Sequence, residues 1–321
     1  MTYIALEEAF AVPAADPARP PWAGNRHRTK TAYTEDWARQ LVDFTEYRLP
    51  DMDAHGIDIQ VLSLTVPGIQ GETDAKKAVA DAIRANDYLA DQIAKHPDRF
   101  RGFAALPMQA PTAAIRELRR CIRDLGFCGA LVNDHTNGRY LDEPVYEDFW
   151  GELESLDVPL YIHPNLVTAD NWHVLDGHPE LHGALWSFGV EVAGHALRLL
   201  FGGVFDRHPN ATVILGHMGE MLPFQVSRLD SRYRVIDPVW SLKRLPSEYI
   251  GSNIVITTSG VFSPAVLEGA VLAIGADAIM FSVDYPYEAT EEAVRGFEAT
   301  NLSETDRAKI AHLNARRVLR L

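Results

Sequence analysis

Short hydrophobic runs recur along the whole chain, and most are followed by a segment with hydrophobic residues spaced as on one face of a helix. The runs predict strands near residues 2–7, 58–64, 102–106, 128–133, 158–163, 212–217, 253–258 and 279–284. Several contain almost no polar residue, which is typical of parallel strands covered on both faces. Eight strands alternating with helices in a chain of 321 residues favour a TIM-type (β/α)8 barrel over an open sheet.

Two of the helical segments have recognisable ends. Residues 73–95 keep one face hydrophobic, with Thr73 as the expected N-cap and Pro97 just beyond the end. Residues 112–125 repeat the pattern, and Gly126 is expected as the C-cap.

Two long irregular stretches interrupt the alternation, residues 12–35 after the first strand and 164–187 after the fifth. Both leave the rim to which the carboxyl ends of the strands point, so they are candidates for lids or pocket walls. Contact between subunits is an equal alternative. No Gly/Ser-rich or charge-block linker divides the chain, so we expect one domain over residues 1–321.

The composition is that of an ordinary soluble enzyme, with 47% hydrophobic and 23% charged residues. A net charge of −14 argues against nucleic acid as a partner, because phosphate binding calls for a basic surface. We find no run of about 20 apolar residues that would span a membrane and no signal-peptide pattern. The two cysteines are too few for a disulfide framework. A cytoplasmic location is the resulting prediction.

Four residues able to bind metal or transfer protons each end a hydrophobic run: Glu7, His163, His217 and Asp284. The carboxyl ends of parallel strands gather at one rim of a barrel, so these side chains are predicted to meet there. Glu7, His163 and Asp284 form a mixed oxygen and nitrogen set that suits Mn²⁺, Mg²⁺ or Zn²⁺. Each alone has a simpler interpretation as a buried, hydrogen-bonded residue, but several buried ionisable groups together are costly without a cation.

Further polar residues lie near these positions. Glu220 follows His217 by three residues, in the expected first turn of the next helix, where it can orient the imidazole for proton transfer. The alternative is that Glu220 only complements the helix N-terminus. Arg48 and Arg228 are candidate clamps for an anionic substrate, and for each a surface ion pair is nearly as good an interpretation.

Four segments resemble the signature blocks of the amidohydrolase-2 branch of the amidohydrolase superfamily: residues 5–10 (ALEEAF), 161–164 (YIHP), 215–220 (LGHMGE) and 281–287 (FSVDYPY). Within that branch the chain is similar to the non-oxidative decarboxylases of hydroxyaryl acids, which include the γ-resorcylate, 2,3-dihydroxybenzoate and 5-carboxyvanillate decarboxylases. Residues 139–143 and 188–191 resemble the 5-carboxyvanillate type in particular.

The resemblance implies roles for individual residues. The implied metal ligands are Glu7, His163 and Asp284. The implied catalytic groups are Asp284, as proton donor, with the pair His217 and Glu220, and the implied substrate-binding residues are Arg48, Arg228 and Tyr287. Many superfamily members carry a second imidazole ligand on the first strand, where this chain has Ala9. Glu7 is then the only ligand expected from that strand.

The implied reaction removes CO₂ from a small aromatic acid with a hydroxyl group ortho to the carboxylate. One divalent ion, Mn²⁺, Zn²⁺ or Mg²⁺, serves as cofactor, no organic cofactor is expected, and the implied assembly is a homodimer or homotetramer. The alternative is a metal-dependent hydrolase that attacks a lactone or amide with activated water. A barrel that only binds its ligand is a third and weaker interpretation, because the catalytic residue types are all present.

Overall fold

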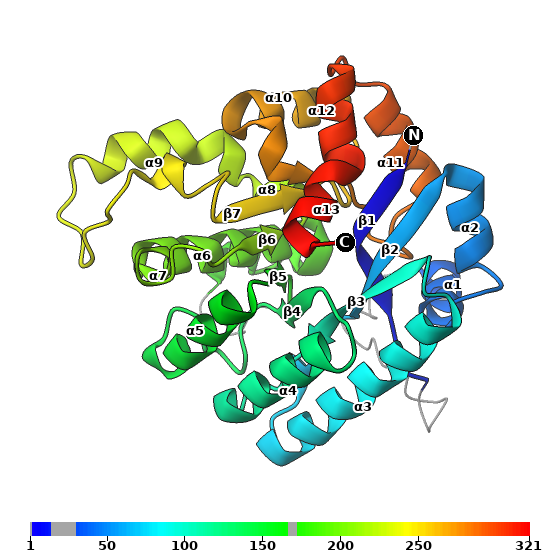
Figure 1. The fold of residues 1–321 in the computed structure, drawn as a ribbon. Helices are drawn as coiled ribbons and strands as arrows, with labels where there is room; N and C mark the ends of the chain where they lie inside the picture. Colours follow the sequence, from blue (N-terminus) through cyan, green and yellow to red (C-terminus); the bar gives the residue numbers. More distant parts are fainter. Residues whose placement is uncertain (1, 14–29, 166–171) are drawn as a thin grey trace.

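The computed structural model describes residues 2–13, 30–165 and 172–321. Its eight strands form one sheet, paired in parallel in the order of the sequence (Figure 1). The strands are β1 (Tyr3–Phe10), β2 (Ile57–Leu64), β3 (Phe100–Ala105), β4 (Gly129–Asn133), β5 (Leu160–His163), β6 (Val213–Leu215), β7 (Ile254–Thr257) and β8 (Ile279–Met280). The predicted (β/α)8 barrel is confirmed.

Helices surround the sheet, and α9 with the residues after it projects away from the barrel (Figure 1). The α-helices are α1 (Thr31–Leu41), α2 (Arg48–His55), α3 (Ala75–Lys95), α4 (Pro111–Arg123), α5 (Glu147–Leu156), α6 (Ser187–Phe201), α7 (Val204–Arg207), α8 (His217–Glu220), α9 (Val226–Tyr233), α10 (Pro264–Ile274), α11 (Thr290–Glu298), α12 (Glu304–Ala308) and α13 (Asn314–Leu319). None of the described helices is long and apolar enough to cross a membrane.

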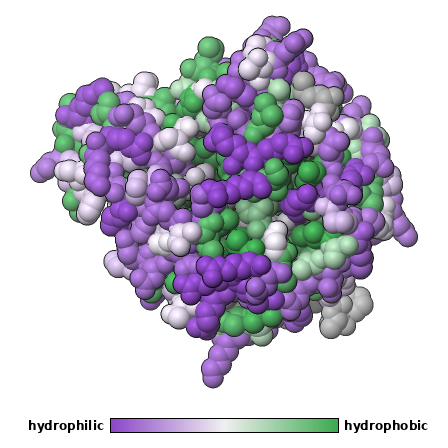
Figure 2. All heavy atoms as spheres, viewed as in Figure 1, coloured by the Kyte–Doolittle hydropathy of each residue, from purple (hydrophilic) through white to green (hydrophobic). Residues whose placement is uncertain are grey.

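The hydrophobic residues of the strands are buried on both sides of the sheet. One cluster fills the barrel interior and includes Leu6, Phe103 and Tyr161. A larger cluster lies between the strands and the surrounding helices. The outer surface on the side shown in Figure 2 is mainly hydrophilic. This double burial explains why the strands read as nearly unbroken hydrophobic runs.

The helix predicted over residues 73–95 is α3, but its N-cap differs from the prediction. Asp74, not Thr73, caps it, because the Asp74 carboxylate accepts hydrogen bonds from the backbone N–H groups of Lys76 and Lys77. A carboxylate also interacts favourably with the positive end of the helix dipole.

The two long irregular stretches lie only partly within the described residues. The end of the first leads into α1, and the second contains three short 3-10 turns between His173 and Leu185. Residues 14–29 and 166–171, which include Trp22, His27 and Arg28, lie outside the described residues. The predicted roles of both stretches therefore stay predictions.

The two edges of the sheet, β1 and β8, meet without a backbone ladder between them in the described chain. Two hydrogen bonds link β1 to the segment after β8 instead. The Glu7 N–H donates to Ser282 Oγ at 2.7 Å, and the Ala9 N–H donates to Tyr285 O at 2.7 Å. We call residues 281–285 together with Glu7, Glu8 and Ala9 the seam of the barrel.

Replacement of Asp74 by alanine removes the N-cap of α3 and is expected to lower the free energy of unfolding by about 1 kcal/mol. Thr73→Ala is the matched control, since Thr73 is exposed and does not cap the helix. Urea denaturation of both variants measures the difference. Equal destabilisation by the two variants would contradict the assignment of the cap.

Candidate active site

A bulge in β1 turns Glu7 toward the barrel interior. Ala5 pairs with Gln60 and Glu8 pairs with Leu62, so β1 contains one more residue than β2 between these two pairs. Leu6 packs in the interior cluster, and Glu7 accepts a hydrogen bond from Tyr161, whose side chain belongs to that cluster. Two consecutive residues therefore face inward, which the alternation of a regular strand does not allow.

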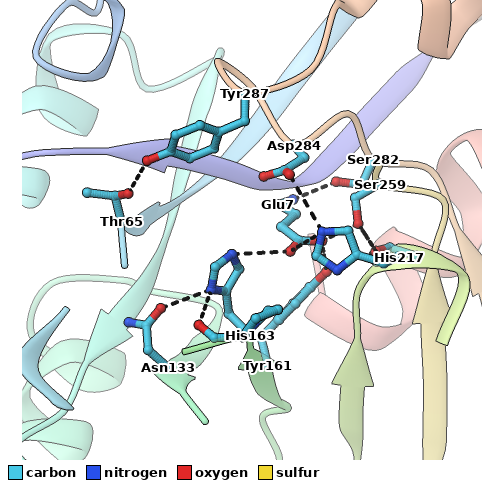
Figure 3. A network of polar contacts seen from close by, with 12 residues as sticks. Glu7, Thr65, Asn133, Tyr161, His163, His217, Ser259, Ser282, Asp284 and Tyr287 are labelled. Atoms are coloured by element: carbon cyan, nitrogen blue, oxygen red, sulfur yellow. Dashed lines mark hydrogen bonds and ion pairs between the residues drawn. The ribbon is translucent and has the colours of Figure 1, made fainter. Parts of the chain in front are cut away.

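The Glu7 carboxylate is buried, and its two oxygens have different surroundings. Oε2 accepts short hydrogen bonds from the hydroxyls of Tyr161 and Ser259. Oε1 is buried and has no hydrogen-bond donor among the described residues. It lies 3.5 Å from His163 Nε2 and 3.7 Å from His217 Nε2 (Figure 3). A bare carboxylate oxygen facing two imidazole nitrogens is what a metal ligand leaves when no ion is present.

Asn133, at the end of β4, orients His163 at the end of β5. The two residues are register partners, and His163 Nδ1 lies 3.0 Å from Asn133 Oδ1 and 2.9 Å from Pro164 O. Both partners are acceptors, so Nδ1 carries the proton and Nε2 presents its lone pair toward Glu7. Burial lowers the pKa of His163, although the charge of Glu7 opposes this. A neutral imidazole is the form that binds metal.

His217 begins a turn with left-handed backbone. The φ angles of His217, Met218, Gly219 and Glu220 are 46°, 58°, 69° and 50°, so α8 is not the ordinary right-handed helix start expected from the sequence. The turn brings Glu220 Oε1 to 2.8 Å from His217 Nδ1 and leaves Nε2 directed at the carboxylates. Such backbone costs roughly 1–2 kcal/mol per non-glycine residue and is concentrated at functional sites.

Asp284 follows β8 and also has a positive φ, of 81°. Its Oδ2 lies 3.6 Å from His217 Nε2. One potential ligand atom each of Glu7, His163 and Asp284 falls within 4.8 Å of the others. The structure thus brings together the three predicted metal ligands, and their donor set and the bare oxygen of Glu7 fit a divalent ion.

The ionisation of this group differs from ordinary values. Burial raises the pKa of Asp284 to about 8; the contact with His217 opposes this, and the charge of Glu7 adds to it. Burial alone would lower the pKa of His217, but the charges of Glu7 and Glu220 and the contact with Asp284 raise it well above its usual range. In the metal-free protein both groups therefore retain protons around neutral pH.

Tyr287, predicted to bind substrate, stands across from Asp284 in the site (Figure 3). Its hydroxyl lies 2.5 Å from Thr65 Oγ1, and its ring packs edge-on against Trp37 at a centroid distance of 5.1 Å. Burial raises the pKa of Tyr287, which keeps the phenol neutral and available as a hydrogen-bond donor.

The two predicted arginine clamps lie elsewhere. Arg48 is fully buried: it donates to Gln60 Oε1 and to Ala9 O, and its guanidinium lies over the Tyr285 ring. These contacts engage the guanidinium, and the predicted role of Arg48 in holding the substrate carboxylate stays a prediction. Arg228 is exposed on α9, and no described hydrogen bond or ion pair joins it to the site, so its role stays a prediction.

Several residues at the site were not singled out from the sequence: Glu8, Asn133, Tyr161, Ser259 and Thr65. Tyr161 had a usable signal, because it precedes His163 by two residues and a strand places such residues on the same face. Asn133 and Ser259 had none, because their partners come from other strands and are far away along the chain.

A second group of potential ligands, Asp134, His135 and Glu191, is buried nearby. Protein groups already engage it. The Gly138 N–H donates to His135 Nδ1 at 3.3 Å, and the Tyr140 hydroxyl donates to Glu191. Asp134 Oδ1 lies 2.7 Å from His195 Nδ1, whereas Asp134 Oδ2 has no hydrogen-bond partner among the described residues.

Comparisons with known proteins identify relatives of the chain. A family model described as amidohydrolase matches residues 14–321. The chain is 45% identical over 326 residues to a γ-resorcylate decarboxylase of Rhizobium sp., covering 99% of this chain and 98% of that protein.

Solved structures place the same fold in two groups of decarboxylase. A dihydroxybenzoic acid decarboxylase from Polaromonas sp., with bound manganese and the inhibitor 2-nitroresorcinol, matches with a TM-score of 0.93 at 43% identity, covering 99% of this chain and 97% of that one. A 5-carboxyvanillate decarboxylase from Novosphingobium aromaticivorans matches with a TM-score of 0.92 at 35% identity and the same coverage. The dihydroxybenzoate enzyme shares more residues with the chain, although two sequence blocks had suggested the carboxyvanillate type.

The raised pKa values predict how the stability of the metal-free protein depends on pH. Asp284 and His217 hold protons in the folded chain at pH values where the unfolded chain has released them, so stability is lost as pH rises through the folded values. We expect the melting temperature in chelator to fall between roughly pH 6 and pH 9, as measured by calorimetry.

Saturating Mn²⁺ is expected to flatten this profile, because the ion replaces the protons as the counter-charge. Asp284→Asn removes one of the two groups and should reduce the slope in chelator. A melting temperature that rises over the same range in the metal-free protein would contradict the assigned ionisation.

The pairing of His217 with Glu220 can be tested through a glycine of α6. A Cβ at Gly189 would lie 2.6 Å from Glu220 Oε2, so Gly189→Ala is expected to displace the carboxylate and lower the pKa of His217. Gly194→Ala, on the same helix but facing open space, should stabilise the helix by about 0.5–1 kcal/mol. NMR titration of the His217 ring reports the pKa; the same value in both variants would rule out the pairing.

Proposed function

Since the chain belongs to the amidohydrolase family, we propose that it catalyses the metal-dependent, non-oxidative decarboxylation of a hydroxyaromatic acid. The observation that carries the proposal is the convergence of Glu7, His163, His217 and Asp284 at one rim, with a buried carboxylate oxygen left bare. Of the substrate classes named among relatives, we favour a 2,6-dihydroxybenzoate, supported by the 45% identity to a γ-resorcylate decarboxylase.

Glu7, His163 and Asp284 would hold the divalent ion. Manganese is supported by the bound metal of the Polaromonas relative. When bound, the ion would supply positive charge that favours the phenolate form of the substrate and helps to orient it. Tyr161 and Ser259 direct the lone pairs of Glu7, and Asn133 fixes the tautomer of His163, so the ligands are oriented in advance.

Asp284 is the proposed proton donor. Burial raises the pKa of Asp284 in the metal-free chain, and we propose that the neighbouring His217 supplies its proton when the ion is bound. The proton goes to the ring carbon that bears the substrate carboxylate, which interrupts the aromatic system. The bond from that carbon to the carboxylate then breaks, its electron pair returns to the ring, and CO₂ leaves. His217 Nε2, 3.6 Å from Asp284 Oδ2, can return the proton to Asp284.

His217 owes this position to Glu220, which holds Nδ1 and stabilises the imidazolium form. On the other side of the site, the hydroxyl groups of Thr65 and Tyr287 contact each other. We propose that Tyr287 donates to the second oxygen substituent of the substrate, since a buried hydroxyl discriminates strongly against substrates that lack the partner group.

The alternative is hydrolysis of a lactone or amide by the same residues, with His217 activating water. The named relatives reported above favour the decarboxylase. The homodimer or homotetramer and the cytoplasmic location stay predictions.

Incubation of the Mn²⁺-loaded protein with 2,6-dihydroxybenzoate is expected to release CO₂ and reduce the absorbance of the substrate. Benzoate, which has no ortho hydroxyl, is the control and should not react. Asp284→Asn should lower kcat roughly 10²-fold or more. Turnover of lactones but of no hydroxybenzoate would select the hydrolase; near-normal kcat in the Asp284→Asn variant would remove Asp284 as proton donor.

A further inference from the structure

The carboxylate of Glu8 lies at the seam of the barrel and accepts hydrogen bonds from the residues next to Asp284. Its Oε1 accepts from the Val283 N–H at 3.0 Å and from Ser282 Oγ at 3.2 Å. Its Oε2 accepts from the Tyr285 N–H at 3.2 Å. Val283 and Tyr285 are the two neighbours of Asp284 in the chain, so one carboxylate holds the backbone on both sides of it.

Gln60 and Arg48 form a buried polar pair next to the Glu8 carboxylate. Gln60 Nε2 lies 3.5 Å from Glu8 Oε2, and Gln60 Oε1 accepts from Arg48 at 2.9 Å. Glu8, Gln60 and Arg48 are each fully buried. Arg48 also lies over the Tyr285 ring, 4.4 Å from its centroid. The guanidinium thus supports both Glu8 and the segment that Glu8 holds, and it supplies the nearby positive charge that a buried carboxylate requires.

The same contacts fix the other carboxylate of the site. Ser282 Oγ, which contacts Glu8, also accepts from the N–H of Glu7 at 2.7 Å. Glu7 and Asp284 come from opposite edges of the sheet, and no backbone ladder within the described chain sets their separation. One backbone hydrogen bond, from the Ala9 N–H to Tyr285 O, crosses the seam next to these residues. The other contacts across it described above involve the side chains of Glu8 and Ser282, so these side chains contribute to the separation of the two carboxylates.

We propose that Glu8 is a positioning residue: its carboxylate takes the place of the missing ladder between β1 and β8 and sets the spacing of Glu7 and Asp284 for the metal and for proton transfer. The proposal rests on the proposed function for its effect on turnover, but its effect on metal binding does not depend on which reaction the protein catalyses.

A carboxylate is required at this position because all four groups around it are donors in these contacts. An amide of the same shape has only one acceptor oxygen and would place its own N–H groups against two donors. Leaving buried backbone N–H groups without acceptors is costly, so the segment on either side of Asp284 is expected to move. The positive φ of Asp284 is a strained conformation that persists only when its surroundings fix it.

Glu8→Gln is the direct test. We expect the dissociation constant for Mn²⁺, measured by calorimetric titration, to increase roughly 10- to 100-fold. The zero-field splitting in the EPR spectrum of bound Mn²⁺ should change, because the ligand geometry changes. With 2,6-dihydroxybenzoate we expect kcat at saturating Mn²⁺ to fall while KM changes less. Mn²⁺ affinity and EPR spectrum equal to those of the wild type would overturn the proposal, even if turnover fell.

The double variant Glu8→Gln/Gln60→Glu separates positioning from simple charge balance. It returns a carboxylate to the Arg48 guanidinium, while the N–H groups of Val283 and Tyr285 still face an amide. We expect the melting temperature to recover relative to Glu8→Gln and the Mn²⁺ affinity to stay weak. Recovery of affinity together with stability would show that Glu8 acts only as the counter-ion of Arg48.

Asp206→Asn is the control for loss of a buried carboxylate in general. Asp206 accepts from Tyr249, Trp240 and the backbone of Lys243, away from the metal ligands. This variant should lose stability but keep the wild-type Mn²⁺ affinity. If it weakens Mn²⁺ binding as much as Glu8→Gln does, the effect is general destabilisation and the proposal fails.

Ser282→Ala provides a second route if Glu8→Gln does not fold. It removes the hydroxyl that joins Glu8 to the N–H of Glu7 and leaves both carboxylates in place. We expect weaker Mn²⁺ binding with an altered EPR spectrum. Unchanged Mn²⁺ affinity and an unchanged spectrum in this variant would overturn the proposal independently of Glu8.

Discussion

The buried carboxylate of Glu7 is the constraint around which the site is organised. Two hydroxyls satisfy one of its oxygens, and the other faces His163 and His217 without a donor. A buried anion in this state is unfavourable unless a cation or protonated neighbours compensate it. The raised pKa values of His217 and Asp284 provide the protonated neighbours in the metal-free chain, and the proposed metal site would provide the cation. Exchange between metal and protons is thus a property of the whole group.

The backbone around this carboxylate departs from regular structure at three places, and each departure directs a side chain into the site. A bulge turns Glu7 inward, a left-handed turn folds Glu220 back onto His217, and a positive φ directs Asp284. Each departure costs conformational energy. The barrel can tolerate them because the strands are packed on both faces and supply most of the hydrophobic burial. Glu8 and Arg48 then fix the seam where backbone pairing is missing.

The sequence was informative where a residue's role follows from its place in a repeating element. Glu7, His163, His217 and Asp284 could be grouped because each ends a hydrophobic run, and the carboxyl ends of parallel strands meet at one rim. The burial of Arg48 could not be anticipated from the sequence, for the complementary reason. An arginine at the start of a helix is usually exposed, and nothing local indicates that Gln60, Ala9 and Tyr285 enclose it. Thr73 was expected as the N-cap and the structure places the cap one residue later, at Asp74. Both residue types are good caps, and the position depends on where the first turn begins.

The order of the strands, the barrel and the four residues that end its hydrophobic runs at the rim could be predicted from the sequence alone, because hydrophobic periodicity and strand ends are local properties. The tertiary structure decided which oxygen of Glu7 stays bare, how His217 is paired and what sets the distance between Glu7 and Asp284. These depend on hydrogen bonds between strands that are distant in the chain, such as the contact of Glu8 with Val283. No local pattern encodes them, because their energy exists only once the barrel has closed.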